Sequence, residues 1–567
     1  MRRLSIFLQS AMALLALIAA VPANAAQGSY VPACSQLATD PAYGVASNPV
    51  IKSASSSIVP ASGSNVAYCQ VKLLYGTNPN QSINIVVGLP LNAVDGGKGG
   101  VQGAWNGRTQ GLGGSGCSGN LRVNSAVNTG YVGSGNDLGH SGGDCTPGVN
   151  PDGTYNYQFI EDFIRNGIKQ QVLWSKSIAK GYYGEPPAFN YWNGCSTGGR
   201  QGYLLAQELG EELQGILANA PAIYWTRFQT AQMWGQIAML DLARGPIDPA
   251  KLAQVRASAV AACDANDGVV DGIIDDPRTC HFNAKANICG KSTAPAANCL
   301  TSQEADAVNK IWDGPRNEDH EKIWFGLDRG SDFSVLDGTT PFALGVTQFI
   351  WDEHDLSFNW QTVPLSGYPD VAQDGSRNIA DITDTFGSLD KFKAHGGKLL
   401  TYVGGNDQFI YPRGVLNYYR QMAARYGHDE GEPNFASLYG FYRLFRAPGV
   451  GHCGIASTGP IPVDPFGALV KWVEGGVPPQ SLLGSGGSAA PPSGRTRPIC
   501  LYPKTAIYNG SGTTDDANNF HCGGNLETKA TVCADVLVKY KHEEDGSLDF
   551  SGTGVDAEKC HENRDRR

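Results

Sequence analysis

The sequence lacks the cysteine spacing that a small zinc site needs, because none of its 14 cysteines forms a C-x-x-C pair. An even number of cysteines without that spacing predicts a disulfide framework and an oxidising compartment. Positive charge is also scarce: 43 Lys and Arg stand against 53 Asp and Glu, which gives a formal net charge of −10. The clustered basic face that nucleic acid requires is therefore not expected.

Long apolar runs are absent beyond the N-terminal segment, so neither a membrane-spanning helix nor a membrane partner is expected. The apolar run from Ala11 to Val21 follows two arginines and precedes Ala23-Asn24-Ala25. This order is typical of a signal peptide, which we assign to residues 1–25, with cleavage after Ala25 or Ala26. We expect the mature protein to be soluble and either secreted or periplasmic.

Glycine, by contrast, is abundant, with 72 residues, and two of them flank a candidate nucleophile. Gly194-x-Ser196-x-Gly198 is the pattern of a nucleophile elbow, in which a serine occupies a tight turn between a strand and a helix. The aromatic run 188–192 before it is typical of a buried strand, and the run 201–209 after it is typical of a helix. Because this context agrees with the pattern, Ser196 is the candidate nucleophile.

Strands of the same apolar kind recur on both sides of the elbow. Further strands are expected at residues 83–90, 215–221, 397–403 and 442–445. Strand, elbow, helix and strand form a βαβ unit, which predicts an α/β fold with a parallel sheet. Between residues 225 and 389, tryptophans and helical segments replace strands. We interpret this segment as a large lid domain inserted into an α/β-hydrolase fold, whose catalytic domain then comprises residues 26–224 and 390–567.

An α/β-hydrolase triad follows the order Ser, acid, His along the chain. Asp407 comes directly after the expected strand 397–403 and is the candidate acid, although Gly-Gly-Asn-Asp is also ordinary turn chemistry. Of the ten histidines, His452 alone combines the required order with a loop after a late strand. The predicted triad is therefore Ser196, Asp407 and His452, acting through an acyl-enzyme.

Two cysteines adjoin this predicted triad, since Cys195 precedes Ser196 and Cys453 follows His452. A disulfide needs Cα atoms about 4.4–6.8 Å apart, and a Ser–His pair needs its side chains within about 3 Å. Both conditions hold together if one bridge joins the two catalytic turns, which predicts a Cys195–Cys453 disulfide. The alternative is that each cysteine pairs elsewhere.

The predicted chemistry also needs backbone N–H groups that face a developing oxyanion. One is expected from Thr197, which follows the nucleophile, and a second from Gly113 or Gly114 in the glycine-rich passage 103–116. The alternative is that this passage is a plain glycine-rich loop.

Residues 263–276 concentrate aspartates and glycines on a short loop, which resembles the start of an EF-hand with shifted spacing and no closing glutamate. Hard carboxylate oxygens at this density favour a structural calcium ion within the lid, far from the ester. A Cys263–Cys280 bridge would close the loop. The alternative is an exposed acidic turn without an ion.

The run 194–201, the acid at Asp407 and the pair His452-Cys453 resemble the tannase and feruloyl esterase family, whose distinctive feature is a cysteine-linked serine and histidine. The tail from Arg497 to Cys522 is similar as well, so the resemblance covers most of the mature chain. It implies a serine esterase for esters of aromatic acids, such as feruloylated or galloylated substrates. One bacterial member acts on mono(2-hydroxyethyl) terephthalate and carries an acidic residue after its nucleophile, so Thr197 favours the phenolic esters.

The resemblance also implies a set of calcium ligands and several disulfides. The implied ligands are the side chains of Asp264, Asp267 and Asp271 and the backbone carbonyls of Val269 and Ile273. The implied disulfides are Cys34–Cys69, Cys289–Cys299 and Cys500–Cys522, which leave Cys117–Cys145 and Cys533–Cys560 by elimination.

Other functions remain open at this point. A non-catalytic binder of phenolics or plant wall could use the same scaffold, although an intact triad counts against it. A peptidase or acyltransferase could use the same triad, although an aromatic lid suits a flat acyl group better than a peptide. Trp351, Phe409 and Ile410 are candidates for the wall of the acyl pocket, and each is equally well a core residue.

Overall fold

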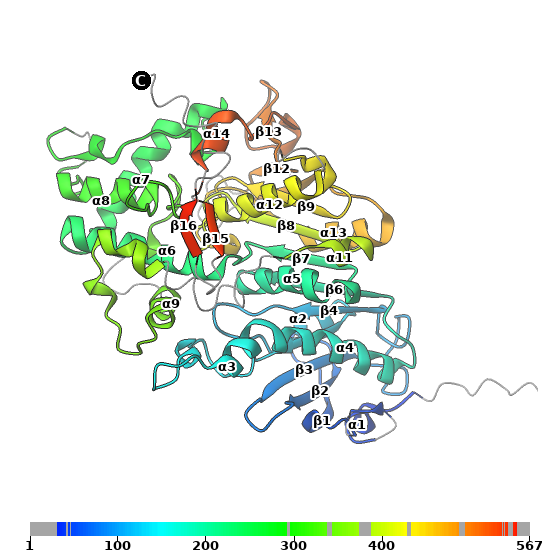
Figure 1. Ribbon diagram of the computed structural model, residues 1–567. Helices are drawn as coiled ribbons and strands as arrows, with labels where there is room; N and C mark the ends of the chain where they lie inside the picture. The colour runs from blue at the N-terminus through cyan, green and yellow to red at the C-terminus, as the bar shows by residue number, and fades with distance from the viewer. Residues whose placement is uncertain are drawn as a thin grey trace, which may run out of the picture.

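The fold is organised by a nine-stranded sheet, shown edge to edge in Figure 1, with strand order β1-β2-β3-β5-β4-β6-β7-β8-β9. The strands from β5 to β9 run parallel, and β1, β2 and β3 extend the sheet in antiparallel fashion. The computed structural model describes residues 31–40, 43–45, 47–291, 295–336, 343–372, 387–427, 433–486, 494–535, 537, 539–542 and 548–552. The predicted signal peptide, residues 1–25, lies outside the described residues.

The parallel part of the sheet carries the elements that the sequence predicts. The nine strands are β1 (Ile51–Val59), β2 (Tyr68–Tyr75), β3 (Ile83–Pro90), β4 (Arg108–Leu112), β5 (Val132–Asn136), β6 (Phe189–Cys195), β7 (Gly215–Asn219), β8 (Lys398–Gly404) and β9 (Tyr442–Ala447). Each strand predicted around the elbow is confirmed. The short β4 lies inside the glycine-rich passage, where its few apolar side chains gave no strand signal.

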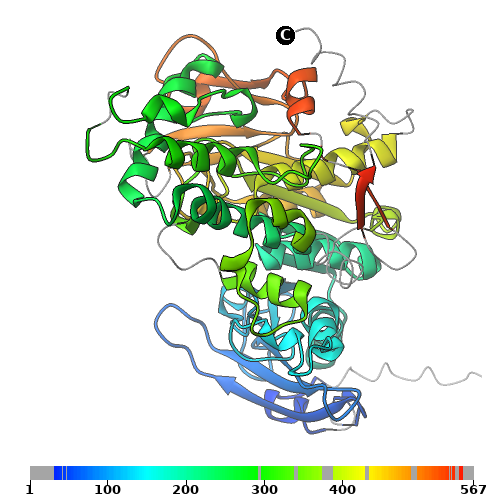
Figure 2. The same ribbon diagram turned by 60° about the vertical axis from the view of Figure 1, so that its left-hand side comes forward.

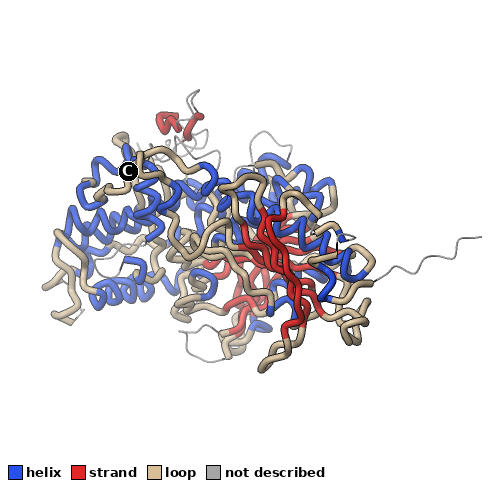
Figure 3. Tube along the Cα trace, turned by 90° about the horizontal axis from the view of Figure 1, so that it is seen from below, coloured by secondary structure: helices blue, strands red, loops and turns tan. Residues whose placement is uncertain are grey.

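Helices cover both faces of this sheet, because successive side chains of each buried strand point to opposite sides. On β6, Trp192 packs into the core beneath α5 (Thr197–Glu208), whereas Tyr191 packs into the core with Leu469 and Trp472 of α13 (Pro465–Gly475). Figure 3 shows the strands enclosed between helices. Other helices on the sheet are α2 (Asn124–Val127), α4 (Gly167–Tyr183) and α12 (Pro412–Gly427). Two buried faces explain why strands such as β7 and β8 are mainly apolar and buried along nearly their whole length.

Residues 225–389, which we call the lid segment, lie between β7 and β8. Its described residues contribute helices and no strand of the large sheet. The main helices are α6 (Trp225–Ala238), α7 (Pro249–Cys263), α8 (Ser302–Asp313) and α9 (Ala343–Glu353). Figures 1 and 2 show them, in green, gathered as one body beside one end of the sheet. The lid segment contacts the loop after β8, where Asn406 Nδ2 donates to the Gly330 carbonyl at 2.7 Å.

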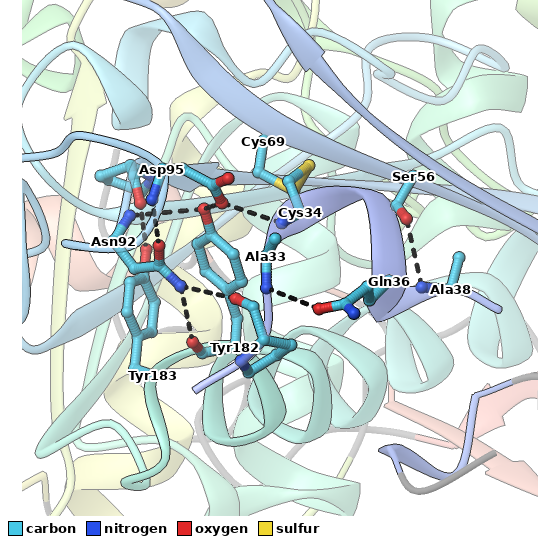
Figure 4. The surroundings of a disulfide bond; sticks show 12 residues. Ala33, Cys34, Gln36, Ala38, Ser56, Cys69, Asn92, Asp95, Tyr182 and Tyr183 are labelled. Carbon is cyan, nitrogen blue, oxygen red and sulfur yellow. Dashed lines mark hydrogen bonds between the residues drawn. A yellow bond between two sulfur atoms is a disulfide. The ribbon is translucent and has the colours of Figure 1, made fainter. Parts of the chain in front are cut away.

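Six disulfides hold the described chain together. They are Cys34–Cys69, Cys117–Cys145, Cys195–Cys453, Cys263–Cys280, Cys289–Cys299 and Cys500–Cys522. All six agree with the predicted pairs, and the predicted Cys533–Cys560 pair includes Cys560, which lies outside the described residues. Figure 4 shows the first bridge, which ties α1 (Cys34–Leu37) to β2. There Asp95 accepts the Cys34 N–H at 2.8 Å and the Tyr182 hydroxyl at 2.5 Å.

The smaller elements are α3 (Tyr157–Glu161), α11 (Asp390–Ala394), α14 (Lys529–Ala534), β10 (Ile461–Pro462), β11 (Ser481–Ser485), β12 (Thr496–Cys500), β13 (Thr505–Tyr508), β14 (Phe520–Gly523), β15 (Lys539–His542) and β16 (Leu548–Gly552).

The C-terminal part returns over the lid segment and α12. Just after α14, the buried carboxylate of Asp535 accepts from Arg413 at 2.6 Å, Arg420 at 2.8 Å and Arg278 at 3.0 Å. Since Arg278 belongs to the lid segment, this cluster joins three parts of the chain.

None of the helices in the described ranges is long and apolar enough to cross a membrane.

Candidate active site

The candidate nucleophile occupies a turn of a single residue. β6 ends at Cys195 and α5 begins at Thr197, so Ser196 alone connects the strand to the helix. Its φ of 63° and ψ of −126° are rare for a residue with a side chain. Glycine is required before this turn, because a Cβ on Gly194 would lie 2.3 Å from the carbonyl oxygen of Gly198, and a Cβ on Gly198 would lie 3.0 Å from Gly113 Cα. This geometry is that of a nucleophile elbow, as the sequence predicts.

The candidate acid, Asp407, lies in the turn after β8 and is fully buried. One carboxylate oxygen accepts the backbone N–H groups of Phe409 and Ile410, each at 2.9 Å. The other oxygen lies 2.9 Å from Nδ1 of His452. Burial, and then the charge of Asp407, raises the pKa of Tyr402 to about 12, so this phenol stays neutral beside the carboxylate. The carboxylate is thus fixed by the backbone and aimed at the imidazole.

The candidate base, His452, lies on a short turn after β9 and is 7% exposed. Its backbone N–H donates to the side-chain oxygen of Gln408 at 3.1 Å. A carboxylate at Nδ1 selects the tautomer in which Nδ1 carries the proton and Nε2 is free to accept one. The residues that the sequence predicts as acid and base are therefore hydrogen-bonded neighbours.

A disulfide joins the turns of the nucleophile and the base. Cys195 and Cys453 are bonded, with Cα atoms 6.1 Å apart. Ser196 and His452 line the same cavity. The Ser196 hydroxyl and the His452 imidazole, both among the described residues, are not hydrogen-bonded to each other in this conformation. In serine hydrolases such bonds often close only when substrate is bound.

The cavity beside Ser196 has a volume of about 200 Å³ and a mainly apolar wall. Its lining residues are Ser115, Gly116, Ser196, Thr197, Ala222, Trp225, Phe228, Gln229, Gln232, Leu344, Phe409, Ile410, His452 and Ile455. Phe409 and Ile410, which the sequence predicts for the wall of the acyl pocket, both line this cavity. Helix α6 supplies a larger share of the wall, which was not predicted because α6 is buried on every side and has no single apolar stripe.

Trp351 does not line this cavity, which corrects the third wall prediction. It lies on α9, is 1% exposed, and its indole N–H donates to the Cys145 carbonyl at 3.0 Å. The Tyr155 hydroxyl donates to the Trp351 carbonyl at 2.9 Å. Trp351 is therefore a core residue that fixes the lid segment to the loop closed by the Cys117–Cys145 bridge.

The two glycines predicted for the oxyanion hole already use their amide groups in this structure. Gly113 N–H donates to the Asn193 carbonyl at 3.0 Å, and Gly114 N–H donates to the Gln201 side chain at 2.9 Å. Both glycines instead bring the passage close to the elbow, since a Cβ on Gly113 would lie 2.4 Å from Gly198 Cα. Thr197 does line the cavity, at the first residue of α5, where the helix dipole favours negative charge.

The predicted calcium loop follows α7 and is closed by the Cys263–Cys280 bridge. The carboxylate of Asp264 accepts three backbone N–H groups, from Asp271, Gly272 and Ile273. The Asp271 carboxylate pairs with Arg497. Burial raises the pKa of Asp271, and the positive charge of Arg497 opposes this rise. The oxygen-rich donor set suits a hard cation, although no three acidic, histidine or cysteine side chains of the described residues converge on one point.

Comparison with known proteins assigns the chain to a family. A family model described as "Tannase and feruloyl esterase" matches residues 101–523, which include Ser196, Asp407 and His452. The chain belongs to the tannase and feruloyl esterase family. As a member of this family it is a carboxylic ester hydrolase, and the resemblance seen in its sequence is confirmed.

Individual relatives agree with the family assignment. A probable feruloyl esterase of Arthroderma benhamiae is 32% identical over 447 residues, which cover 74% of this chain and 80% of that protein. The crystal structure of feruloyl esterase B from Aspergillus oryzae superposes with a TM-score of 0.71 at 24% identity, over 83% of this chain and 96% of that one. The structure of tannin acyl hydrolase from Aspergillus niger superposes with a TM-score of 0.72 at 21% identity, over 86% of this chain and 94% of that one. These likenesses confirm the α/β-hydrolase fold of this family member.

Proposed function

We propose that this family member hydrolyses carboxylic esters of phenolic acids, of the feruloyl esterase or tannase type. The proposal is supported by the names of its relatives, which include a probable feruloyl esterase and a tannin acyl hydrolase. The observation that carries it is the meeting of Ser196 with the paired His452 and Asp407 at one mainly apolar cavity.

The proposed reaction proceeds through an acyl-enzyme. The Ser196 hydroxyl attacks the ester carbonyl while Nε2 of His452 takes its proton. Asp407 keeps the imidazole in the tautomer that can accept this proton and stabilises the imidazolium that forms. His452 then protonates the departing alcohol, and a water molecule, activated by the same imidazole, releases the acid from Ser196.

Negative charge develops on the carbonyl oxygen during both steps. We assign its stabilisation to the backbone N–H of Thr197 at the start of α5, where preorganised donors and the helix dipole act on the oxyanion. A donor of this kind contributes roughly 100–1,000-fold to kcat in serine hydrolases.

The size and wall of the cavity support an aromatic acyl group. A volume of about 200 Å³ exceeds the ~150 Å³ in which an apolar cavity binds benzene, so one substituted ring fits. Trp225, Phe228 and Phe409 offer ring surfaces on which a flat acyl group can pack. No lysine or arginine lines the cavity among the described residues, so the carboxylate of a terephthalate monoester would lack a counter-charge.

We further propose that the protein is exported and that the loop after α7 binds a structural calcium ion. Six disulfides in the described chain support an oxidising compartment. The proposed calcium ligands are the carboxylates of Asp264, Asp267 and Asp271 and the carbonyls of Val269 and Ile273. The ion would neutralise these carboxylates and stabilise the lid segment, without a part in the chemistry.

A substrate panel tests the proposed function. Purified protein is incubated with methyl ferulate, methyl gallate and mono(2-hydroxyethyl) terephthalate, and free acid is quantified by chromatography, with Ser196→Ala as the blank. We expect turnover of at least one phenolic ester that exceeds turnover of the terephthalate monoester, and none by the variant. Preference for the terephthalate monoester would contradict the phenolic assignment. Binding without turnover would favour a non-catalytic phenolic or plant-wall binder on this scaffold.

A further inference from the structure

Two glutamines from one helix face the otherwise apolar part of the cavity. Gln229 and Gln232 lie on α6 and both line the cavity beside Ser196. Gln229 is 1% exposed, and neither its amide nitrogen nor its amide oxygen has a hydrogen-bond partner within the described chain. Gln232 donates through its nitrogen to the Phe409 carbonyl at 2.7 Å, while its oxygen likewise lacks a partner there.

An amide buried without hydrogen bonds is costly, at about 1–3 kcal/mol for each unsatisfied group. Core positions are normally filled by apolar side chains for this reason. Phe228 and Leu344 line the same cavity and have no polar side-chain atom, and the indole N–H of Trp225 makes no hydrogen bond to Gln229 in the described structure. An unsatisfied polar side chain in a binding cavity is best explained if the ligand supplies the missing partners.

The bond from Gln232 to Phe409 has a second consequence. The Gln232 nitrogen donates one of its two N–H groups to Phe409, and the unpaired Gln232 oxygen, like any amide oxygen, can only accept a hydrogen bond. Phe409 is held on the other side by Asp407, whose carboxylate accepts its backbone N–H. The orientation of Gln232 is thus fixed by the loop of the catalytic acid, and its free oxygen selects a donor group on the ligand.

We propose that Gln229, together with the oxygen of Gln232, binds a hydroxyl group on the aromatic ring of the acyl moiety and so determines specificity for phenolic over unsubstituted acids. This inference rests on the proposed function and adds to it the residues that read the ring. A phenolic hydroxyl donates one hydrogen bond and accepts another, and the Gln229 amide offers a carbonyl oxygen that accepts and an N–H that donates. A site built to bind a hydroxyl discriminates strongly against the analogue without it, because its own buried groups then remain unpaired.

The experiment compares two esters that differ by one hydroxyl group, methyl 4-hydroxycinnamate and methyl cinnamate. The readout is the ratio of their kcat/KM values. For the unmodified protein we expect a ratio of about tenfold or more, the contribution of one hydrogen bond made in a buried site. In Gln229→Leu, which has a similar volume and no polar atoms, the ratio should fall close to one. Because the readout is the ratio of the two kcat/KM values, a change that affects both esters equally does not alter the comparison.

A matched control lies on the same helix. Gln236 is 4% exposed and does not line the cavity, so Gln236→Leu should leave the ratio unchanged. If Gln229→Leu does not fold, Gln229→Met, which keeps an unbranched side chain, provides the same comparison. A ratio close to one in the unmodified protein, or a ratio that survives in the Gln229 variants, would overturn the inference while leaving the esterase assignment intact. Absence of turnover of both esters and of methyl ferulate and methyl gallate would instead refute the proposed function.

Discussion

The disulfide between Cys195 and Cys453 joins the residue before the candidate nucleophile to the residue after the candidate base, across 258 positions of sequence. Backbone on both sides is strained, since Ser196 and Cys453 have positive φ values of 63° and 50°. The bridge therefore restrains two turns that come from different strands of the sheet. From its position we predict that it aligns Ser196 with His452 in addition to stabilising the fold.

We predict that removing this bridge lowers kcat, an effect that removal of a bridge far from the cavity does not have. In the double variant Cys195→Ser/Cys453→Ser, the two turns separate more freely, and kcat should fall by about 100-fold, as it does for small misplacements of reacting groups. The control is Cys34→Ser/Cys69→Ser, which removes a bridge remote from the cavity. That variant should have a lower melting temperature than the unmodified protein and an unchanged kcat. Equal kcat in both variants would contradict an aligning role.

The second prediction concerns the candidate acid. Asp407→Asn keeps the size of the side chain but removes the charge that selects the tautomer of His452, so kcat should fall by about 10,000-fold. The melting temperature should change far less, because the asparagine oxygen can still accept the Phe409 and Ile410 N–H groups. Asp390→Asn, at an exposed ion pair with Arg425, is the control and should retain full activity. If kcat falls by less than tenfold in Asp407→Asn, another residue must act as the acid of the triad.

Much of this site was predictable because its chemistry imposes local sequence rules. The elbow needs small residues on either side of Ser196, so its glycines are visible in the sequence, and Asp407 and His452 follow strands in a fixed order. The wall of the cavity obeys no such rule. Trp351 and Phe409 are both aromatic lid or loop residues, and only packing decides that one is core and the other lines the cavity.

The oxyanion glycines illustrate the same limit at the level of the backbone. Gly113 and Gly114 stand at the expected place, but the partners of their amide groups depend on how β4 and α5 meet in space. The glutamines of α6 were missed for a related reason. Glutamine on a helix normally indicates an exposed face, and only the packing of α6 against α8 and α9 within the lid segment buries Gln229.

A third prediction concerns the buried ion cluster around Asp535, where three arginines surround one carboxylate. Their charges lower the pKa of Asp535 despite its burial. Asp535→Asn leaves these arginines without their shared partner, and unfolding should require about 3–5 kcal/mol less free energy at neutral pH. Because the folded pKa is depressed, the stabilisation is present above the ordinary pKa of about 3.9 and is lost as pH falls below it.

Thermal unfolding between pH 3 and 7 checks this prediction. The difference in melting temperature between the unmodified protein and Asp535→Asn should narrow on acidification below about pH 4. Asp306→Asn, at a half-exposed ion pair with Lys285, should cost only about 0–1 kcal/mol. A difference that does not depend on pH would show that the loss arises from packing and not from charge.

A fourth prediction concerns metal removal. Treatment with EDTA should lower the melting temperature by roughly 5 °C, and added calcium should restore it, since a ligand that binds only the folded state stabilises it. Elemental analysis should find one calcium ion per chain, and Asp267→Asn should lose it while Asp306→Asn keeps it. A melting temperature that EDTA does not change, in protein without bound calcium, would indicate that the loop is an acidic turn held by its own hydrogen bonds.

The central claim, that Ser196 is the nucleophile, is tested most directly by covalent labelling. A fluorophosphonate reacts with an activated serine, and peptide mapping by mass spectrometry then locates the modified residue. Ser115 also lines the cavity and serves as an internal comparison, because no histidine–aspartate pair is predicted to activate it. We predict one label per chain, on Ser196, with loss of activity in proportion to labelling. A label on Ser115 or another residue, or full activity after labelling of Ser196, would contradict the account.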